Sequence, residues 1–245
     1  MNKVFKYSLV LLGSLLLVGI IYMGATFPPV LAAYAAKTMC SCTYVMGRAQ
    51  ECVVRKEKTK SKPNKFFEYS SGTANLLSKI IRQSLGDSLY YRFPYERLFY
   101  KIGMYHTLLE PDASGTFVGS SCGYGSARDW ARFGLLYLND GVWNGERILP
   151  EGWVKYSSTP VPAAPIGQYG AQFWLNAGAK DNYEKSYHPG IPHDEFGAEG
   201  FEEQSVFIIP SQKLVVVRLG ISHHGFDIVG LTQKIMSALP ETKSQ

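Results

Sequence analysis

The feature that most constrains this chain is a long uncharged stretch near its N-terminus. Residues 7–34 contain no Asp, Glu, Lys or Arg, and their most apolar part, Leu9 to Phe27, lies behind Lys3 and Lys6. About 20 apolar residues are enough to cross a bilayer as a helix, and positive residues before such a helix favour a cytoplasmic N-terminus. We therefore predict a single-pass membrane anchor, held by membrane lipid, with the body of the chain on the extracytoplasmic (periplasmic) side.

Two alternatives to an uncleaved anchor remain for this stretch. A secretory signal peptide has a shorter apolar core and a small-residue cleavage site, for which Ala33-Tyr34-Ala35 is a candidate. A buried core helix is the other alternative, although such helices are usually shorter. Both the anchor and the signal peptide place the body outside the cytoplasm, so residues 1–36 are interpreted as a membrane anchor or signal.

The positive charge of the chain is concentrated in one short segment. The formal net charge is +5, and residues 55–65 read Arg-Lys-Glu-Lys-Thr-Lys-Ser-Lys-Pro-Asn-Lys without any apolar period. Such a polar run containing proline is typical of a solvated linker. Because the excess charge is local, we predict no nucleic-acid partner. Residues 37–65 are accordingly interpreted as a linker and junction, followed by a folded domain over residues 66–245.

The sequence contains four cysteines, at Cys40, Cys42, Cys52 and Cys122. An exported body permits disulfides, and a bridge from Cys52 to Cys40 or Cys42 is one possibility, with unpaired thiols as the other. A Cys-x-Cys pair followed by a lone cysteine matches no standard zinc spacing. We therefore predict neither a metal site nor a cofactor.

A regular pattern of apolar residues begins at residue 66. Apolar residues at 76, 77, 80, 81 and 85 form one stripe of a helix that Gly86 would close. Further helices are predicted over 95–102, 126–138, 150–156 and 226–239, and strands over 172–176, 204–210 and 213–219. The last two strands flank a short turn, which predicts an antiparallel hairpin covered by the terminal helix. The pattern indicates the α+β class, with an antiparallel sheet flanked by helices.

Three segments form a recognisable set in their order and spacing: Tyr69-Ser70-Ser71, residues 125–150 and residues 206–220. They resemble the family of class C β-lactamases, penicillin-binding proteins and related esterases, which are serine hydrolases. Tyr69-Ser70-Ser71 is similar to the Tyr-x-Asn/Ser element of that family. The resemblance covers about residues 64–240, and residues 30–48 resemble the region after the anchor in membrane-bound members. It implies an incomplete β-lactamase-like domain whose intact relatives act on amides, esters or β-lactams of small-molecule or peptide-like substrates.

The resemblance implies acyl transfer by an activated serine. In the family a serine attacks a carbonyl, a lysine three residues later and a tyrosine transfer protons, and backbone N–H groups stabilise the oxyanion. No serine in this sequence has a lysine three positions later, and Thr59 with Lys62 has the spacing only within the polar linker. We interpret the chain as an internally truncated, inactive homologue that lost its nucleophile-bearing part. The alternative is a non-catalytic, membrane-tethered binding module.

The resemblance also assigns roles to residues of the second and third motifs. Tyr69 would be the tyrosine of the second motif and Ser71 its polar partner, whereas from the residues alone Ser71 is the N-cap of the following helix. The third motif, a basic residue with glycine two positions later, aligns with residues 200–204. There Phe201 replaces the basic residue and Glu203 the glycine, which adds bulk and negative charge where an oxyanion would develop.

A second alternative is an α/β-hydrolase-like esterase that uses Ser121. Residues 119–123 fit the Gly-x-Ser-x-Gly nucleophile elbow, which requires a strand, a sharp turn at the serine and a helix that starts at once. The next predicted helix begins only at Ser126. Candidate partners downstream are Asp194, Asp227, His223 and His224.

We expect the chain to stay in the pellet when membranes are washed with carbonate, because an apolar helix over residues 7–27 would hold it in the bilayer. Immunoblots of pellet and supernatant measure the retained fraction. Leu16→Lys should lower that fraction, because it puts a charge in the middle of the helix at a cost of about 3 kcal/mol. A soluble form beginning near Ala36 would show instead that a signal peptide is removed.

Overall fold

The computed structural model describes residues 67–179, 185–222 and 225–239. All of its named helices and strands belong to one compact unit formed by residues 58–111 and 115–245. A second unit contains residues 1–57 and 112–114, and its described part is a short turn in which Ser114 Oγ donates a hydrogen bond to Asp112 Oδ1 at 2.6 Å.

The local sequence explains where helices α6 and α8 of the larger unit begin, because capping residues precede them. Their bounds are α4 (Ser71–Leu85), α5 (Asp87–Tyr90), the π-helical turn η2 (Tyr95–Phe99), the 3₁₀ turn η3 (Tyr100–Ile102), α6 (Ala127–Leu138), α7 (Trp153–Ser157) and α8 (Ile228–Ala238). Helix α6 follows a capping box between Ser126 and Asp129, and Asp227 caps α8 by accepting a hydrogen bond from the N–H of Gly230. These caps satisfy N–H groups that the first turn of a helix leaves without partners.

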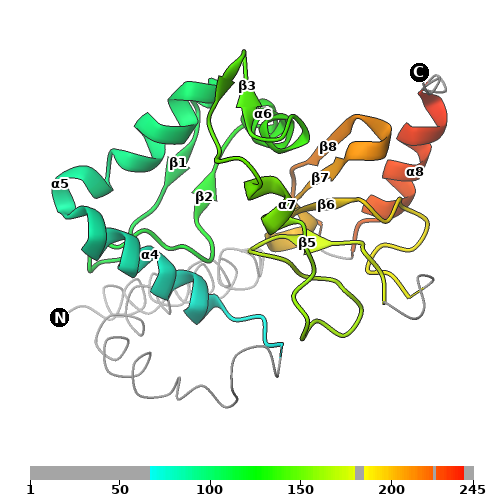
Figure 1. Ribbon diagram of the computed structural model, residues 1–245, viewed down its shortest axis with the longest axis horizontal. Coiled ribbons are helices and arrows are strands. Elements are labelled where there is room, and N and C mark those ends of the chain that lie inside the picture. Colours follow the sequence, from blue (N-terminus) through cyan, green and yellow to red (C-terminus); the bar gives the residue numbers. More distant parts are fainter. Residues whose placement is uncertain (1–66, 180–184, 223–224, 240–245) are drawn as a thin grey trace, which may run out of the picture. The chain divides into compact units, whose positions relative to one another are not determined.

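An antiparallel sheet with the strand order β5-β6-β7-β8 forms the centre of the domain (Figure 1). Its parts are β5 (Trp174–Leu175), β6 (Phe196–Glu199), the 3₁₀ turn η4 (Phe201–Glu203), β7 (Ser205–Ile209), the 3₁₀ turn η5 (Pro210–Gln212) and β8 (Leu214–Arg218). Two smaller antiparallel pairs are β1 (Leu108–Leu109) with β2 (Gly123–Tyr124), and β3 (Val142–Trp143) with β4 (Glu146–Arg147). In the register of the large sheet, Trp174, Gly197, Phe207 and Val216 lie side by side and share one face.

Helix α6 packs against the other face of the sheet. Tyr137 of α6 joins a core cluster with residues from the sheet and the segment before it, namely Phe173, Leu175, Phe196, Val206 and Ile208. Gly134 permits the close approach of helix and strand, because a Cβ atom there would lie 2.5 Å from Cγ1 of Val215. A second core cluster joins Leu136 of α6 to Phe99, Ile102 and Met104.

The structure confirms the predicted antiparallel sheet flanked by helices, and it corrects several bounds. The hairpin predicted over 204–220 is formed by β7 and β8, and α6 packs directly on one of its faces. The strand predicted over 172–176 is reduced to β5, and the helix predicted over 95–102 is one π turn followed by one 3₁₀ turn. The sequence pattern does not predict strand β6, because Phe-Gly-Ala-Glu lacks β-branched residues and contains glycine.

Several predictions concern residues outside the described part of the chain. The anchor over residues 7–27, the linker over 37–65 and Cys40, Cys42 and Cys52 all fall there, so these interpretations, and the domain boundary at residue 66, stay predictions. Within the three described ranges, no helix is long and apolar enough to cross a membrane. Cys122 is a free thiol, and the same ranges hold no cluster of three side chains suited to a metal ion.

We expect Val216→Asp to lower the free energy of unfolding by about 3 kcal/mol or more, because Val216 is only 6% exposed beside Phe207 and the new carboxylate would have no partner. Ile221→Asp is the matched control, since Ile221 is 60% exposed and should change stability by about 0.5 kcal/mol or less. Urea unfolding of both variants measures the difference, and equal midpoints would contradict the assignment of β8.

Candidate functional site

Tyr69 lies two residues before the first residue of α4. Its ring centroid lies 5.0 Å from that of Trp174 and 5.6 Å from that of Tyr169, and 56% of the residue is exposed. Ser70, which follows it, is the N-cap of α4 and accepts a hydrogen bond from the N–H of Gly72 at 3.2 Å. Ser71 is therefore the first residue of the helix, and the prediction that Ser71 is the N-cap is wrong by one position.

Tyr69 belongs to a group of five aromatic side chains, called here the aromatic wall: Phe67, Tyr69, Tyr169, Trp174 and Tyr187. The ring of Phe67 lies 5.3 Å from that of Tyr169, and Tyr169 lies 5.1 Å from Trp174. Trp174 of β5 is stacked on Tyr187 at 4.8 Å. Aromatic pairs at such distances contribute about 0.5–1.5 kcal/mol each beyond the burial of their area. Tyr69 is thus attached to the edge strand of the sheet through Trp174.

Two tyrosines of the aromatic wall are held in their protonated form. Burial, followed by the proximity of Tyr69, raises the pKa of Tyr169 to about 12. Burial and the carboxylate of Glu199 raise the pKa of Tyr187 to about 12, and Tyr187 Oη donates a hydrogen bond to Glu199 Oε2 at 3.3 Å. At neutral pH both hydroxyls can therefore donate hydrogen bonds but cannot act as bases.

A buried histidine lies beside the aromatic wall, between two carboxylates. Nδ1 of His188 lies 3.0 Å from Oε2 of Glu195, and Nε2 lies 3.1 Å from Oε1 of Glu199. Glu195, Gly197 and Glu199 are alternate positions of β6 and its start, so they share the face of the sheet that carries Phe207. The ring of Phe207 lies 4.6 Å from that of His188. His188, Glu195 and Glu199 are called here the His188 cluster.

The two carboxylates determine the charge of this histidine. Burial alone would lower the pKa of His188, but the contacts with Glu195 and Glu199 outweigh burial and raise that pKa to about 9. Burial raises the pKa of Glu195 as well, and its Oε1 has no hydrogen-bond partner among the described residues. The side chains of His188 and Glu195 are 10% and 1% exposed. His188 and Glu195 are too deeply buried to meet a substrate, whereas Glu199 is 24% exposed, so we interpret the cluster as a positioning element.

Asn176 fixes the loop that carries His188. Its buried Oδ1 accepts a hydrogen bond from the N–H of His188 at 2.6 Å, and its Nδ2 donates to the carbonyl oxygens of His188, Ile191 and Pro192 at 3.0, 2.9 and 3.2 Å. Replacing a buried amide whose hydrogen bonds are all formed lowers stability, because its former partners are left without hydrogen bonds. The loop from residue 185 to residue 193 is thereby tied to the end of β5.

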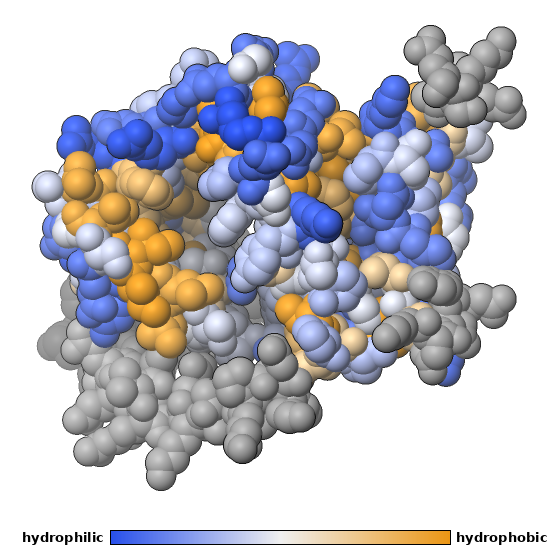
Figure 2. Space-filling view, viewed as in Figure 1, coloured by the Kyte–Doolittle hydropathy of each residue, from blue (hydrophilic) through white to orange (hydrophobic). Residues whose placement is uncertain are grey.

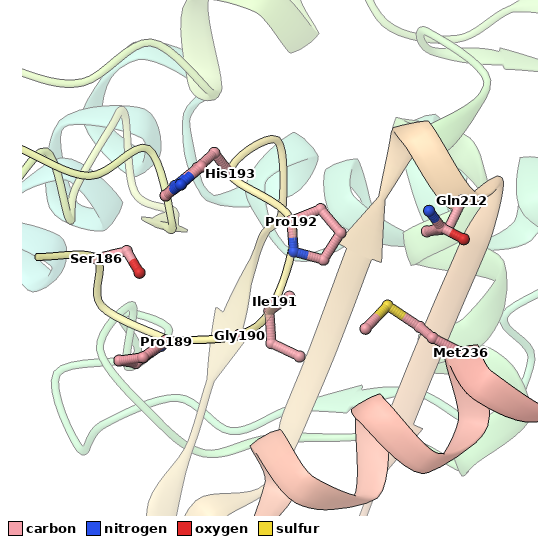
Figure 3. Close-up of a pocket in the computed structure, with 8 residues that line it drawn as sticks. All are labelled: Ser186, Pro189, Gly190, Ile191, Pro192, His193, Gln212 and Met236. Carbon is pink, nitrogen blue, oxygen red and sulfur yellow. The ribbon is translucent and has the colours of Figure 1, made fainter. Parts of the chain in front are cut away.

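An open pocket of about 590 Å³ lies beside this loop (Figure 3). Figure 3 shows Met236 of α8 and Gln212 of η5 on one side of it and the loop on the other. Its lining residues are Ser186, Pro189, Gly190, Ile191, Pro192, His193, Gln212 and Met236. None of the motif residues lines this pocket, and we assign it no catalytic role.

The residues aligned with the third motif lie in the turn η4 between β6 and β7. Phe201 is 58% exposed. Glu202 and Glu203 have φ angles of 58° and 61°, in the left-handed region that glycine adopts most easily. The backbone at position 203 therefore has the conformation expected of the glycine that the family alignment places there. The carboxylate of Glu203 accepts a hydrogen bond from the N–H of Phe226.

Ser121 does not lie in the geometry of a nucleophile elbow. It is exposed on a bend before β2, which pairs with β1, and the chain runs on through β2 before α6 begins. Its Oγ lies 3.6 Å from Sγ of Cys122. Of its candidate partners, Asp194 accepts hydrogen bonds from the N–H and Oγ of Ser211, and Asp227 caps α8. His223 and His224 lie outside the described residues.

Sequence reasoning misses the His188 cluster and Trp174. The available signal is a pair of glutamates four positions apart with Gly197 midway between them, which on a strand places both carboxylates on one face. That signal depends on recognising β6, which the local sequence does not predict. The approach of His188 to both acids is decided by the fold of the loop before them.

Comparisons with known proteins give one family match and several similar structures. A family model described as Beta-lactamase matches residues 51–229. A solved structure from Bacillus anthracis, provisionally named a 6-aminohexanoate-dimer hydrolase, is 27% identical with a TM-score of 0.57, and the match covers 72% of this chain and 44% of the relative. A beta-lactamase from Mycobacterium bovis is 17% identical with a TM-score of 0.53. That match covers 73% of this chain and 65% of the relative, and at this identity it shows the fold alone.

This chain therefore spans less than two thirds of the length of either solved relative. A search of curated proteins finds no match.

We expect the free energy of unfolding to fall as pH rises between about 6.5 and about 9. The ordinary pKa of histidine is 6.5 and that of folded His188 is about 9, so in this window the folded state binds the extra proton and the stabilisation is lost as pH rises. His188→Gln should remove this slope and cost about 3 kcal/mol near pH 6.5, because it leaves the buried Glu195 and the partly buried Glu199 without a cation. His193→Gln is the control, and an unchanged slope in His188→Gln would contradict the assignment.

Proposed function

This chain belongs to the beta-lactamase family, and from that premise we propose that it is a homologue of these serine hydrolases that does not form an acyl-enzyme. One observation carries the proposal: none of the serines in the whole sequence has a lysine three residues later. The family chemistry requires a hydroxyl and an amine about one helical turn apart, so that the amine can take the proton as the hydroxyl attacks. Without that pair no nucleophile is activated.

The surroundings of Tyr69 support this proposal. By resemblance Tyr69 is the tyrosine of the second motif, which in the family transfers protons to and from the serine and lysine. In the described part of this chain its ring contacts are with Tyr169 and Trp174, and no serine or lysine side chain forms a hydrogen bond with it. Tyr69 is thus half-exposed on the aromatic wall with no nucleophile to serve.

The altered third motif supports it as well. In the family a basic residue and a glycine of this motif lie near the developing oxyanion. Here Phe201 and Glu203 occupy those positions, and the Glu203 carboxylate is occupied by the N–H of Phe226. A carboxylate at such a position opposes the negative charge of a tetrahedral intermediate. The turn therefore keeps its backbone shape while its side chains are unsuited to the chemistry.

We further propose that the domain is tethered to a membrane on the extracytoplasmic side through residues 7–27, and that the nucleophile-bearing part was lost between about residues 52 and 66. The second proposal is supported by the resemblance of residues 30–48 to the region after the family's anchor and of residues 64–240 to its C-terminal part, with the part between them missing. A tethered domain that keeps the aromatic wall without turnover would act as a binding module. The ligand class of such a module is the amide, ester or β-lactam class of the intact relatives.

The proposal is tested by incubating the full chain in detergent with a fluorescent penicillin and, separately, with a fluorophosphonate. We expect no covalent adduct by intact mass, because loss of the nucleophile alone removes about 10⁶-fold in rate in a well-studied protease. An active member of the family serves as the positive control under the same conditions.

An adduct would overturn the proposal in a way that its position identifies. An adduct on Ser121 that disappears in Ser121→Ala would establish the esterase alternative. An adduct on any other serine would place a working active site elsewhere in the chain. Ser120→Ala is the matched control for Ser121→Ala, because the two serines are neighbours in the same loop.

A further inference from the structure

Helix α4 is held to the rest of the domain by polar contacts. Ser78 Oγ lies 2.7 Å from Tyr90 Oη and donates a hydrogen bond to the carbonyl oxygen of Phe117 at 2.8 Å. Tyr90 Oη accepts in turn from the N–H of Phe117 at 2.9 Å, and Arg82 donates to Thr116 Oγ1 at 3.2 Å. Ser78 and Arg82 therefore lie on the side of α4 that faces the domain, and of its larger apolar residues only Leu76 and Leu85 are partly buried.

Three of the five residues in the apolar stripe of α4 point away from the domain, whereas Leu76 and Leu85 are partly buried. Leu77, Ile80 and Ile81 are 44%, 47% and 46% exposed, whereas Ser78 is buried. These three positions have the i, i+3, i+4 spacing of one helix face. A surface helix of a soluble protein normally turns this face to the core. In α4 these three residues of the stripe face outward instead, so they are available to an apolar partner.

The exposed stripe continues beyond α4. Leu89 of α5 and Phe93 in the turn after it are 47% and 42% exposed. Figure 2 shows apolar surface gathered over α4 and α5 at the left of the view. Large contiguous apolar surfaces mark sites of interaction with proteins or membranes. These five residues, Leu77, Ile80, Ile81, Leu89 and Phe93, are called here the α4–α5 patch.

Basic side chains accompany the patch. Residues 67–103 contain five basic residues and three acidic ones. Lys79 belongs to α4 itself, and Arg92, which pairs with Glu96 at 3.4 Å, lies next to Phe93 with 61% of its side chain exposed. Two further basic residues, Arg82 and Lys101, are paired with Asp87 and Glu146. Apolar side chains on one face with lysine and arginine beside them are typical of helices that lie in the interface of a bilayer.

We propose that the α4–α5 patch rests on the phospholipid surface of the membrane to which the chain is tethered. Helix α4 is the first element after the predicted anchor and linker, so the anchor would bring this helix, before any other, to the bilayer. Burying five apolar side chains among the acyl chains supplies the partner that the domain does not, while the basic residues lie among the head groups. The proposal rests on the proposed tether, but not on the absence of acylation.

The test uses the full chain reconstituted in vesicles of phosphatidylcholine and phosphatidylglycerol (3:1), with a small fraction of phospholipid that carries a diazirine on its acyl chain. After illumination the protein is cleaved after glutamate, and lipid adducts are mapped by mass. We expect the peptide of residues 69–96, which contains the whole patch, to carry several-fold more adduct than the peptide of residues 204–241. The latter contains the exposed Ile221 as an internal control.

Variants separate the patch from the tether. The double variant Leu77→Gln, Ile80→Gln should remove most of the adduct from residues 69–96. The control variant Ile221→Gln should leave that adduct unchanged. An unchanged circular dichroism spectrum verifies that each variant is folded. Labelling confined to residues 1–34 would overturn the proposal while leaving the tether intact. Cross-links between residues 69–96 of two copies, or between residues 1–57 and 69–96 of one copy, would overturn it by identifying another occupant. Failure of carbonate retention would instead remove the tether.

Discussion

The contact of His188 with two carboxylates is the interaction on which the surroundings of Tyr69 depend. Glu195 and Glu199 hold the imidazole against β6 at 3.0 and 3.1 Å. The loop that carries His188 also places Tyr187 flat against Trp174, and Trp174 in turn contacts Tyr69. A buried charge that loses its partner is strongly destabilising. The aromatic partner of Tyr69 is therefore supported by charged side chains that do not touch Tyr69 itself.

The beta-lactamase scaffold of this chain is held together by packing, and we propose that it no longer carries the family's acyl-transfer chemistry. The sheet, helix α6 and the hairpin of β7 and β8 form a well-packed core that needs no catalytic residue. The turn η4 retains the backbone that a glycine would favour although a glutamate occupies it. Packing and backbone geometry can persist when the residues of a site change, because function depends on a few side chains placed on a fold.

Helix α4 illustrates how far a periodic pattern can be interpreted. The spacing of its apolar residues predicts a helix with one apolar stripe, and the structure confirms the helix and its end at Gly86. The same spacing does not say toward which side the stripe points. Ser78 and Arg82 have hydrogen-bond partners on the domain, and those bonds turn their side of the helix inward and most of the apolar stripe outward. The direction of a stripe is set by the partners available around it.

The sequence by itself determined the features that depend on neighbouring residues: the helix α6, the hairpin of β7 and β8, and the lack of a serine–lysine pair. Only the tertiary structure decided the existence of β6, the His188 cluster and the outward stripe of α4. Caps, turns and apolar periods act over a few residues and are therefore written in the local sequence. Strand β6 pairs with strands on both of its sides, and His188 is held between two acids. Both arrangements depend on segments that meet only after the sheet has formed.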